Sequence, residues 1–437
     1  MKDHNRAKSL YLSRIASEFD RLRDDLKKQR LLNGTRDTAM ARFAEIGFPT
    51  KRHEKWKHTD IRSLFSCQFE TAEAVSLKKE AIDPFLLLGD EENFVVCVNG
   101  RFDRKLSRIS EEIIACSLAH AAETRADLVD THLAKHLGFQ NSAFVALNTA
   151  FATDGIFIYV PDHTIVEKPI HLLHLSDNER ATAYPRHLFI MGRNSRIQLI
   201  ESYHSLRKSP YLNNCASEII LGNNARVEHL KIQSEDEQAF HIAARQVCQS
   251  RGSLYSSVAI DLGGSLSRND LNVLLDAEGI ETNLYGFYLA RGSQLVDNHT
   301  FIDHAKPHCQ SAELYKGVLS DHAVGVFSGK VLVRKDAQKT KAFQQNQTLL
   351  LSQDAKINSK PHLKIFADDV KCSHGATVGE LDEEALFYMR TRGISEENAH
   401  AMLRYAFAQD VLAHIGNKTA RQRVEEIVME RFKEHVN

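Results

Sequence analysis

The chain has 437 residues, with 56 Lys and Arg against 57 Asp and Glu, and its formal net charge is −1. This length exceeds what one hydrophobic core usually organises, so two or three domains are expected. A net charge this close to zero gives no electrostatic sign of binding to nucleic acid or to an anionic membrane, and we expect the protein to bind neither.

Signals for export and membrane insertion are missing from the sequence. The N-terminal segment lacks the apolar core of a signal peptide, and no apolar run reaches the about 18 residues that a membrane span needs. The seven cysteines are scattered without a C-x-x-C pair, and their number is odd. We therefore expect a cytoplasmic protein with reduced thiols and no disulfide framework.

The first region, residues 1–150, is charged and is predicted to be mainly helical. Apolar side chains recur there at three- and four-residue steps, at Ile15, Phe19, Leu22 and Leu26. This stripe is typical of an amphipathic helix, which we place over residues 8–32. A short strand is predicted at 94–100, where Asn99 and Gly100 supply a turn signal.

The second region, residues 151–370, is rich in short runs of Val, Ile, Leu and Tyr separated by Gly, Asn, Asp and Ser, which predicts strands. Small residues in turn contexts recur at intervals of 12 to 18 residues, at Ser253, Ser265, Gly279, Ser293, Cys309, Ala323, Ala337 and Ala355. Such spacing leaves no room for helical crossovers and favours a parallel β-helix. A β-sandwich remains the alternative, because it also spaces its strands closely.

The third region, residues 371–437, is predicted to be helical. Asp382 is a candidate N-cap for a first helix that ends at Gly393, and Ser395 can cap a second. The expected apolar face of that second helix carries Ala399, Met402, Leu403, Ala406 and Phe407. A third helix would carry Ile427, Val428 and Phe432. This unit could cover the last coil of a solenoid or dock a partner.

Cys372 and His374 are the candidate metal ligands of the chain. In an extended backbone, residues two apart project from the same side of a strand. A thiolate beside an imidazole suits zinc, copper or iron–sulfur chemistry, yet a tetrahedral centre needs about four donors. The alternative is that Cys372 is a buried small hydrophobe and His374 a hydrogen-bonded loop residue.

The segment around this pair, DDVKCSHGATVGELDEEALFYMRTRGI at 368–394, closely resembles the C-terminal signature of the SufB/SufD family of the SUF iron–sulfur cluster assembly machinery. Similarity extends over most of the chain, at 48–61, 144–161, 314–333 and 337–357. The short Cys-x-His spacing and the length of the chain fit the SufD branch better than the SufB branch. The resemblance implies a right-handed parallel β-helix core, at 151–370, between helical domains at 1–150 and 371–437.

The resemblance also implies a function. The chain would be a non-catalytic scaffold in a SufB–SufC–SufD complex, pairing with SufB through its β-helix and holding the SufC ATPase with its C-terminal helices. Cys372 and His374 would be candidate ligands of a transient iron–sulfur cluster near the SufB interface, with no cofactor permanently bound. In agreement, the sequence has no G-x-x-x-x-G-K-[ST] loop, so ATP hydrolysis must come from another chain.

Three alternatives stay open. The chain could be a purely structural partner of SufB that contributes no ligand, or, isolated, it could form a homodimer through unpaired strand edges. Parallel β-helices also serve as carbohydrate-active enzymes, but Asp261, Asp270, Asp276 and Asp297 share no motif of a paired acid and base.

The cluster of His299, His304, His308 and Cys309 resembles a metal site, yet residues this close in sequence need not meet on a solenoid, and we expect no ligand role.

Overall fold

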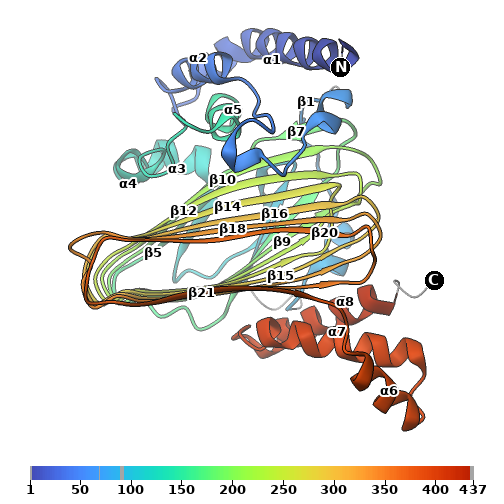
Figure 1. Ribbon diagram of the computed structural model, residues 1–437. Coiled ribbons are helices and arrows are strands. Elements are labelled where there is room, and N and C mark those ends of the chain that lie inside the picture. The colour runs from blue at the N-terminus through green and yellow to red at the C-terminus, as the bar shows by residue number, and fades with distance from the viewer. Residues whose placement is uncertain (1, 68, 89–92, 434–437) are drawn as a thin grey trace.

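A computed structural model describes residues 2–67, 69–88 and 93–433. Its centre is a β-solenoid in which successive strands alternate between two sheets, so that each coil adds one strand to each sheet. Figure 1 shows the two sheets facing each other, with the N-terminal helices above one and the C-terminal helices below the other. The predicted parallel β-helix flanked by helices is confirmed, and the β-sandwich alternative is wrong because neighbouring strands of the solenoid run parallel.

The first sheet, called here the upper sheet, has the strand order β20-β18-β16-β14-β12-β10-β8-β5-β4, and β1 and β7 pair beside it. Its strands are β1 (Glu70–Thr71), β4 (Ile114–Ser117), β5 (Ile156–Val160), β7 (Ala181–Ala183), β8 (Arg186–Met191), β10 (Leu212–Leu221), β12 (Phe240–Gln249), β14 (Leu266–Leu275), β16 (Leu295–His304), β18 (Val324–Val333) and β20 (Lys356–Ile365).

The second sheet, called here the lower sheet, has the order β21-β19-β17-β15-β13-β11-β9-β6-β2-β3. Its strands are β2 (Asn93–Val98), β3 (Arg101–Arg108), β6 (Ile170–Ser176), β9 (Arg196–Ser205), β11 (Arg226–Ser234), β13 (Leu254–Asp261), β15 (Glu281–Ala290), β17 (Gln310–Leu319), β19 (Lys341–Leu350) and β21 (Lys371–Gly379). The strand predicted at 94–100 is β2, which pairs with β6, so the N-terminal region supplies strands to the solenoid as well as helices.

The parallel register stacks equivalent residues of successive coils into columns. In β19, alternate side chains are buried and exposed, and the buried set, which includes Ala342 and Gln344, faces the solenoid interior. One such interior column of the lower sheet is apolar in its first coils, with Ile197, Val227 and Tyr255 in register. The solenoid core therefore consists of columns that run across the coils.

Tight corners between the sheets explain the periodic small residues. Asn194, Asn224 and Gly252 stack at one corner with positive φ, and Asn224 Nδ2 donates to Asn194 Oδ1 at 3.0 Å. A Cβ on Gly252 would lie 2.4 Å from Asn224 Oδ1, so the ladder ends in a residue without a side chain. Ser253 directly follows Gly252, and Cys309 follows His308, which also has a positive φ. Both side chains, at two of the predicted small positions, are buried.

The N-terminal helices cover the first coils of the upper sheet. They are α1 (Lys2–Lys28), α2 (Arg36–Ile46), α3 (Leu118–Thr124), α4 (Ala126–His132) and α5 (Ala143–Phe151), with short 3₁₀ turns η1 (Glu54–Trp56), η2 (Arg62–Ser66), η3 (Lys79–Ala81) and η4 (Asp83–Phe85). As the periodicity predicts, Ile15, Phe19 and Leu26 of α1 are buried, and they share a hydrophobic cluster with outward-facing Phe240 and Leu266 of the solenoid.

The C-terminal helices are α6 (Glu383–Thr391), α7 (Glu396–Leu412) and α8 (Lys418–Lys433). Asp382 accepts from the backbone N–H groups of Glu384 and Ala385, and Ser395 accepts from that of Asn398, so both predicted N-caps are confirmed. The helical segment expected from residue 371 begins later, because Lys371–Gly379 forms β21 of the solenoid.

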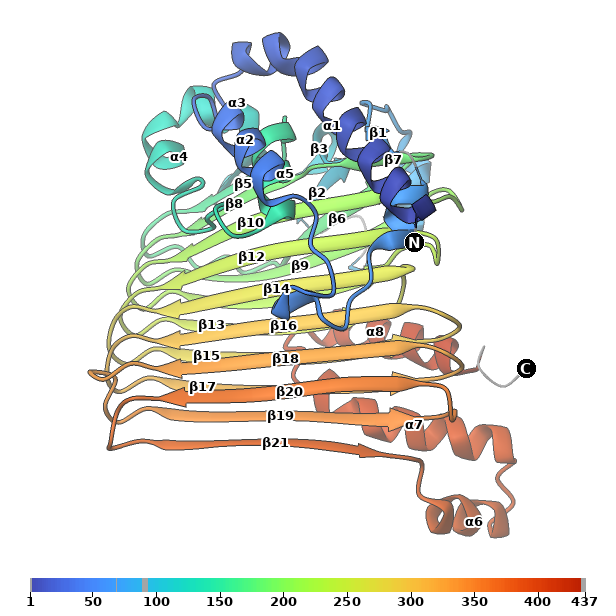
Figure 2. The same cartoon turned by 45° about the horizontal axis from the view of Figure 1, so that its top comes forward.

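The apolar face predicted for α7 is only partly right: Ala399 is buried and Leu403 and Phe407 are half-buried, but Ala406 is exposed. Met402 is 47% exposed, whereas Ala408, Val411 and Leu412 are buried against the outer face of β15 and β17 and against α8. The buried face of α7 is thus set by its contacts with β15, β17 and α8. As a result the helical unit lies beside the lower sheet and leaves the last coil uncovered, as Figure 2 shows for β20 and β21. Within the described residues, no helix is both long and apolar enough to cross a membrane.

Candidate metal-ligand site at the uncovered end of the solenoid

Cys372 and His374 lie on β21, the last strand of the lower sheet. Cys372 is in register with Ala342, and His374 with Gln344, whose side chains face the interior. Both candidate ligands therefore project from the interior side of the strand. Cys372 is half-buried against the apolar core, whereas His374 is exposed, because no further coil follows β21 in the described chain.

The Cys372 thiol is held in its neutral form. Partial burial raises its pKa above the ordinary value, against a smaller opposite effect of the Ala342 backbone. The neighbouring positive charge, Lys371, projects from the opposite face of β21. Deprotonation of Cys372 therefore depends on a metal or a charge brought to the uncovered end.

The column that ends at His374 is polar in its last coils. It runs from His229 through Ser257, Leu284, Glu313 and Gln344. Gln344 Nε2 donates to Glu313 Oε2 at 2.5 Å, and both side chains are buried. Burial raises the pKa of Glu313 to about 7, since the hydrogen bonds from Gln344 and Thr300 offset only part of the desolvation.

A second group of ligand-type side chains lies in the interior of the first coils. His174, His187 and Glu201 offer ligand atoms within 4.8 Å of one another, and all three are buried. Burial lowers the pKa of His187 to about 4, so its imidazole is neutral. Although burial opposes ionisation, Arg245 and His229 hold the pKa of Glu201 well below its usual range.

The hydrogen bonds of this interior group speak against a metal. His187 Nδ1 accepts from the Ile156 backbone N–H at 3.0 Å, so the proton of the neutral ring sits on Nε2 and blocks that nitrogen as a ligand. The Glu201 carboxylate accepts from Tyr203, His229 and Arg245. Its charge is thus already balanced by the guanidinium of Arg245.

This interior group was missed by the sequence prediction, because its three members come from β6, β8 and β9 and share no spacing motif. The stacking of His174 on Tyr203, with ring centroids 4.3 Å apart, follows from their pairing in register. Predicting that these residues meet would have required knowing the register between successive coils.

His299, His304, His308 and Cys309, in contrast, do not come together, as expected. His299 bonds to Asp297 on the outer face of the solenoid, while His304 faces the interior and His308 is exposed at a turn.

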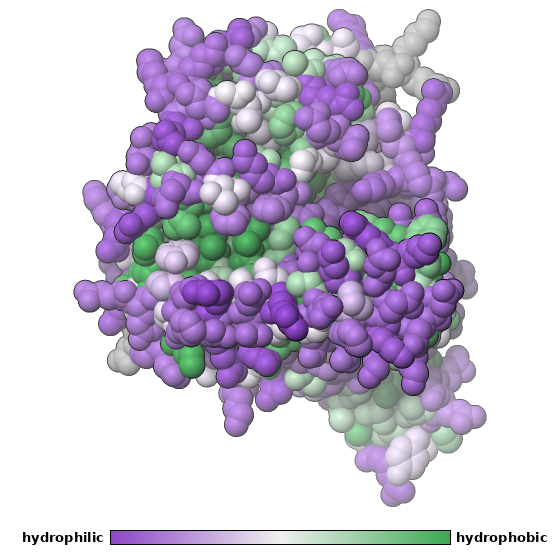
Figure 3. Space-filling view, turned by 90° about the vertical axis from the view of Figure 1, so that its left-hand side faces the viewer, coloured by the Kyte–Doolittle hydropathy of each residue, from purple (hydrophilic) through white to green (hydrophobic). Residues whose placement is uncertain are grey.

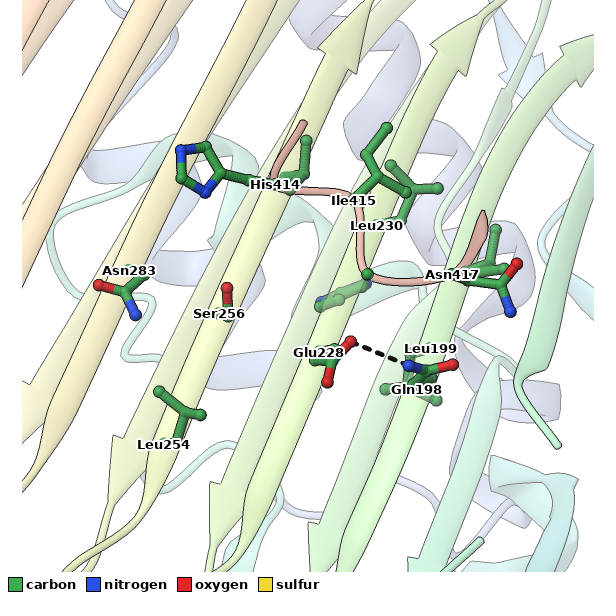
Figure 4. A pocket seen from close by; sticks show the side chains of 14 residues that line it. Gln198, Leu199, Glu228, Leu230, Leu254, Ser256, Asn283, His414, Ile415 and Asn417 are labelled. Atoms are coloured by element: carbon green, nitrogen blue, oxygen red, sulfur yellow. Dashed lines mark hydrogen bonds between the residues drawn. The ribbon is translucent and has the colours of Figure 1, made fainter. Parts of the chain in front are cut away.

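A crevice of about 270 Å³ separates the outer face of the lower sheet from the loop between α7 and α8. Figure 4 shows that loop crossing the strands, with Gln198 donating to Glu228 beneath it and His414 at one end. The His414 ring stacks on Tyr285 with centroids 3.6 Å apart. The crevice contains neither candidate ligand, and its contacts attach the helical unit to the solenoid.

Comparison with known proteins places this architecture in a family. Residues 174–407 match the family model described as the SufBD core domain of SUF system FeS cluster assembly, and residues 14–172 match the SufBD protein N-terminal region. The chain is 34% identical to an iron–sulfur cluster assembly SufBD family protein of Synechocystis, over 94% of this chain and 95% of the relative. It is also 29% identical to the iron–sulfur cluster assembly protein SufD of Escherichia coli, over 88% of this chain and 89% of that protein. From the matches to both family models and to these full-length relatives, the chain belongs to the SufBD family of iron–sulfur cluster assembly proteins and is SufD-like.

Proposed function

We propose that the chain is a non-catalytic scaffold subunit of a cytoplasmic SufB–SufC–SufD complex, and that it presents Cys372 and His374 to an iron–sulfur cluster under assembly. The observation that carries the proposal is the position of this pair. Both side chains lie on the interior side of the last coil, which the described chain leaves uncovered. The cluster is cargo here, so the site needs to be open to a partner and to release what it holds.

The chemistry of the pair fits a shared and transient site. Neutral imidazole coordinates iron without losing a proton, whereas the Cys372 thiol, with its raised pKa, becomes a ligand only when a metal displaces its proton. Two protein ligands leave coordination positions for sulfide and for side chains of the partner. A site of this kind forms when two chains meet and opens when they separate.

The uncovered coil is suited to strand pairing with SufB. As the last strands of their sheets, β20 and β21 each have one edge without a neighbouring strand in the described chain. Apolar side chains are exposed at this end, including Phe343, Phe366 and Val378. An unpaired edge with apolar side chains readily accepts strands of a partner, and a second solenoid of the same family offers matching strands. In the isolated chain the same edge favours a homodimer.

The SufC ATPase is expected to dock on the C-terminal helices. None of the residues of α6 is buried, and Phe387 and Tyr388 are 71% and 59% exposed, with Met402 of α7 also exposed. Figure 3 shows apolar surface on the protruding C-terminal unit at the lower end of the view. Exposed aromatic side chains on a protruding unit are typical anchors of a protein interface.

Anaerobic reconstitution of the chain co-expressed with its SufB and SufC partners tests the proposal. We compare the wild type with His374→Ala and with Ser373→Ala, which changes an exposed neighbour on the other face of β21. Loss of the cluster absorption band in His374→Ala alone, with the complex intact by size exclusion, supports a ligand role. An unchanged band would show that the ligands belong to SufB and that this chain is a purely structural partner.

A further inference from the structure

Gln344 is the covered neighbour of His374. It lies in register with His374 on one side and with Glu313 on the other, and paired strands of a sheet are about 4.8 Å apart. Since β19 is the only strand that pairs with β21 in the described sheets, Gln344 is the interior side chain next to His374 in its column. The long Gln side chain can therefore reach the imidazole ring.

The amide of Gln344 has a fixed orientation. Its Nε2 donates to Glu313 Oε2 at 2.5 Å, so the amide nitrogen faces Glu313. The interior is built around this arrangement at Gly329, where a Cβ would lie 2.1 Å from Gln344 Nε2. Any larger residue at position 329 would displace the amide.

The other end of this amide has an unused acceptor. Gln344 Oε1 is buried, and no described residue donates a hydrogen bond to it. A buried amide oxygen without a donor is unfavourable, so a nearby N–H group gains by binding there. The ring N–H of His374 is the donor that the column offers on that side.

We propose that Gln344, held in place by Glu313, is a positioning residue for His374, which rests on the ligand role assigned to His374 above. Gln344 Oε1 accepts a hydrogen bond from one ring nitrogen of His374, so the other nitrogen is deprotonated and turned toward the uncovered end. Metal-binding histidines are commonly oriented in this way by a carbonyl or carboxylate behind them. The exposed ring, which has many rotamers when free, is thereby held in a single tautomer and orientation.

Cobalt(II) binding to the complex with the SufB and SufC partners is the first test. The signal of the pair is the difference in thiolate-to-cobalt absorption between the wild type and the double variant Cys372→Ala/His374→Ala. We expect Gln344→Leu to weaken cobalt binding at this site about tenfold or more. Gln345→Leu is the matched control, since Gln345 is the next residue of β19 but is exposed on the opposite face, and it leaves binding unchanged.

A spectroscopic readout separates positioning from a general loss of structure. In the zinc-loaded complex, ¹⁵N resonances assigned by their loss in His374→Ala report which ring nitrogen carries the proton. We expect one tautomer in the wild type and a mixture of tautomers in Gln344→Leu. Glu313→Gln, which keeps the volume but lets the amide turn over, produces the same mixture and serves if Gln344→Leu does not fold.

The outcomes separate the positioning role of Gln344 from the ligand role of Cys372 and His374. Wild-type cobalt affinity and a single unchanged tautomer in both Gln344→Leu and Glu313→Gln would overturn the positioning role and leave the ligand pair intact. If the double variant binds cobalt as the wild type does, the ligand role of Cys372 and His374 is refuted, and the positioning role with it.

Discussion

His229 and His374 occupy the same interior column at opposite parts of the solenoid, and their surroundings differ completely. His229 is 2% exposed; its Nε2 lies 2.9 Å from Glu201 Oε2 and its Nδ1 lies 3.1 Å from Tyr255 Oη. His374 is exposed at the edge of the last coil. Neighbouring coils supply a hydrogen-bond partner for both ring nitrogens of His229, whereas one side of the His374 ring faces open space.

The comparison shows how one repeated position comes to lie in two different surroundings. A polar side chain in a covered coil must be satisfied by its neighbours, so it becomes part of a hydrogen-bond network that stabilises the fold. The same position in an uncovered coil keeps its nitrogen available for a metal or a partner. Variants that act on the covered coils should therefore change stability, and variants at the uncovered end should change assembly.

The largest loss of stability is expected from Glu218→Gln in the covered coils. Glu218 pairs with Arg186 at 2.9 Å with both side chains fully buried, and it also accepts backbone N–H groups of Ala134, His136 and Leu137. Neutralising it leaves a buried guanidinium without its counter-charge, which costs about 3–5 kcal/mol of unfolding free energy. Urea denaturation measures this loss.

Glu228→Gln is the control for that measurement, because the partner of Glu228, Arg196, is 55% exposed. Exposed ion pairs contribute about 1 kcal/mol or less. Equal losses in the two variants would contradict the distinction between covered and exposed charge.

Near the uncovered end, Glu313→Gln is expected to change the unfolding free energy relative to the wild type by an amount that varies by about 3 kcal/mol with pH. The folded protein raises the pKa of Glu313 from 4.5 to about 7, so the folded state holds this proton more tightly than the unfolded state. The associated stability is complete below pH 4.5 and is lost as the pH rises to about 7. The unfolding free energy of the variant, relative to that of the wild type, should therefore rise by ~3 kcal/mol between pH 4 and pH 8.

Thermal or urea unfolding of Glu313→Gln at both pH values checks this expectation. Asp270→Asn, at a partly exposed side chain outside the solenoid, is measured as a comparison. A Glu313→Gln difference that does not change with pH would show that the fold does not raise the pKa of Glu313.

The direct comparison of the two histidines should separate stability from assembly. His229→Ala leaves Glu201 and Tyr255 without one of their partners and is expected to lower the unfolding free energy by about 2–3 kcal/mol. His374→Ala removes an exposed ring and should stay within about 0.5 kcal/mol of the wild type. Unfolding of the isolated chain measures both, and a large loss in His374→Ala would make His374 a structural residue.

The smallest effect on stability is expected at α6. Phe387→Ser/Tyr388→Ser removes two exposed aromatic side chains and should change the unfolding free energy by about 0.5 kcal/mol or less. The same variant should lower the amount of SufC retained on size exclusion, since these side chains are the expected anchors. Leu10→Ser, at an exposed apolar residue of α1, is the control and should retain SufC.

Local features of this protein were predictable from sequence because they depend on neighbours along the chain. The N-caps Asp382 and Ser395 act on backbone groups within three residues, and the stripe of α1 follows from helical periodicity. The common orientation of Cys372 and His374 follows from the alternation of side chains along a strand. The recurrent small residues also indicated the solenoid, since they lie in the turns between its successive strands.

Features that depend on how coils and units stack were decided by the tertiary structure. Gln344 meets Glu313, and His174 meets Tyr203, because the register pairs residues about one coil apart, and the coil length changes along the chain. The buried face of α7 depends on which sheet the helix contacts, and the end of the solenoid at Gly379 depends on the pairing of β21 with β19. The sequence by itself determined the local geometry and the family of this protein. The tertiary structure decided which interior side chains are satisfied by a neighbouring coil and which remain open to a ligand, because that depends on contacts between residues far apart in the chain.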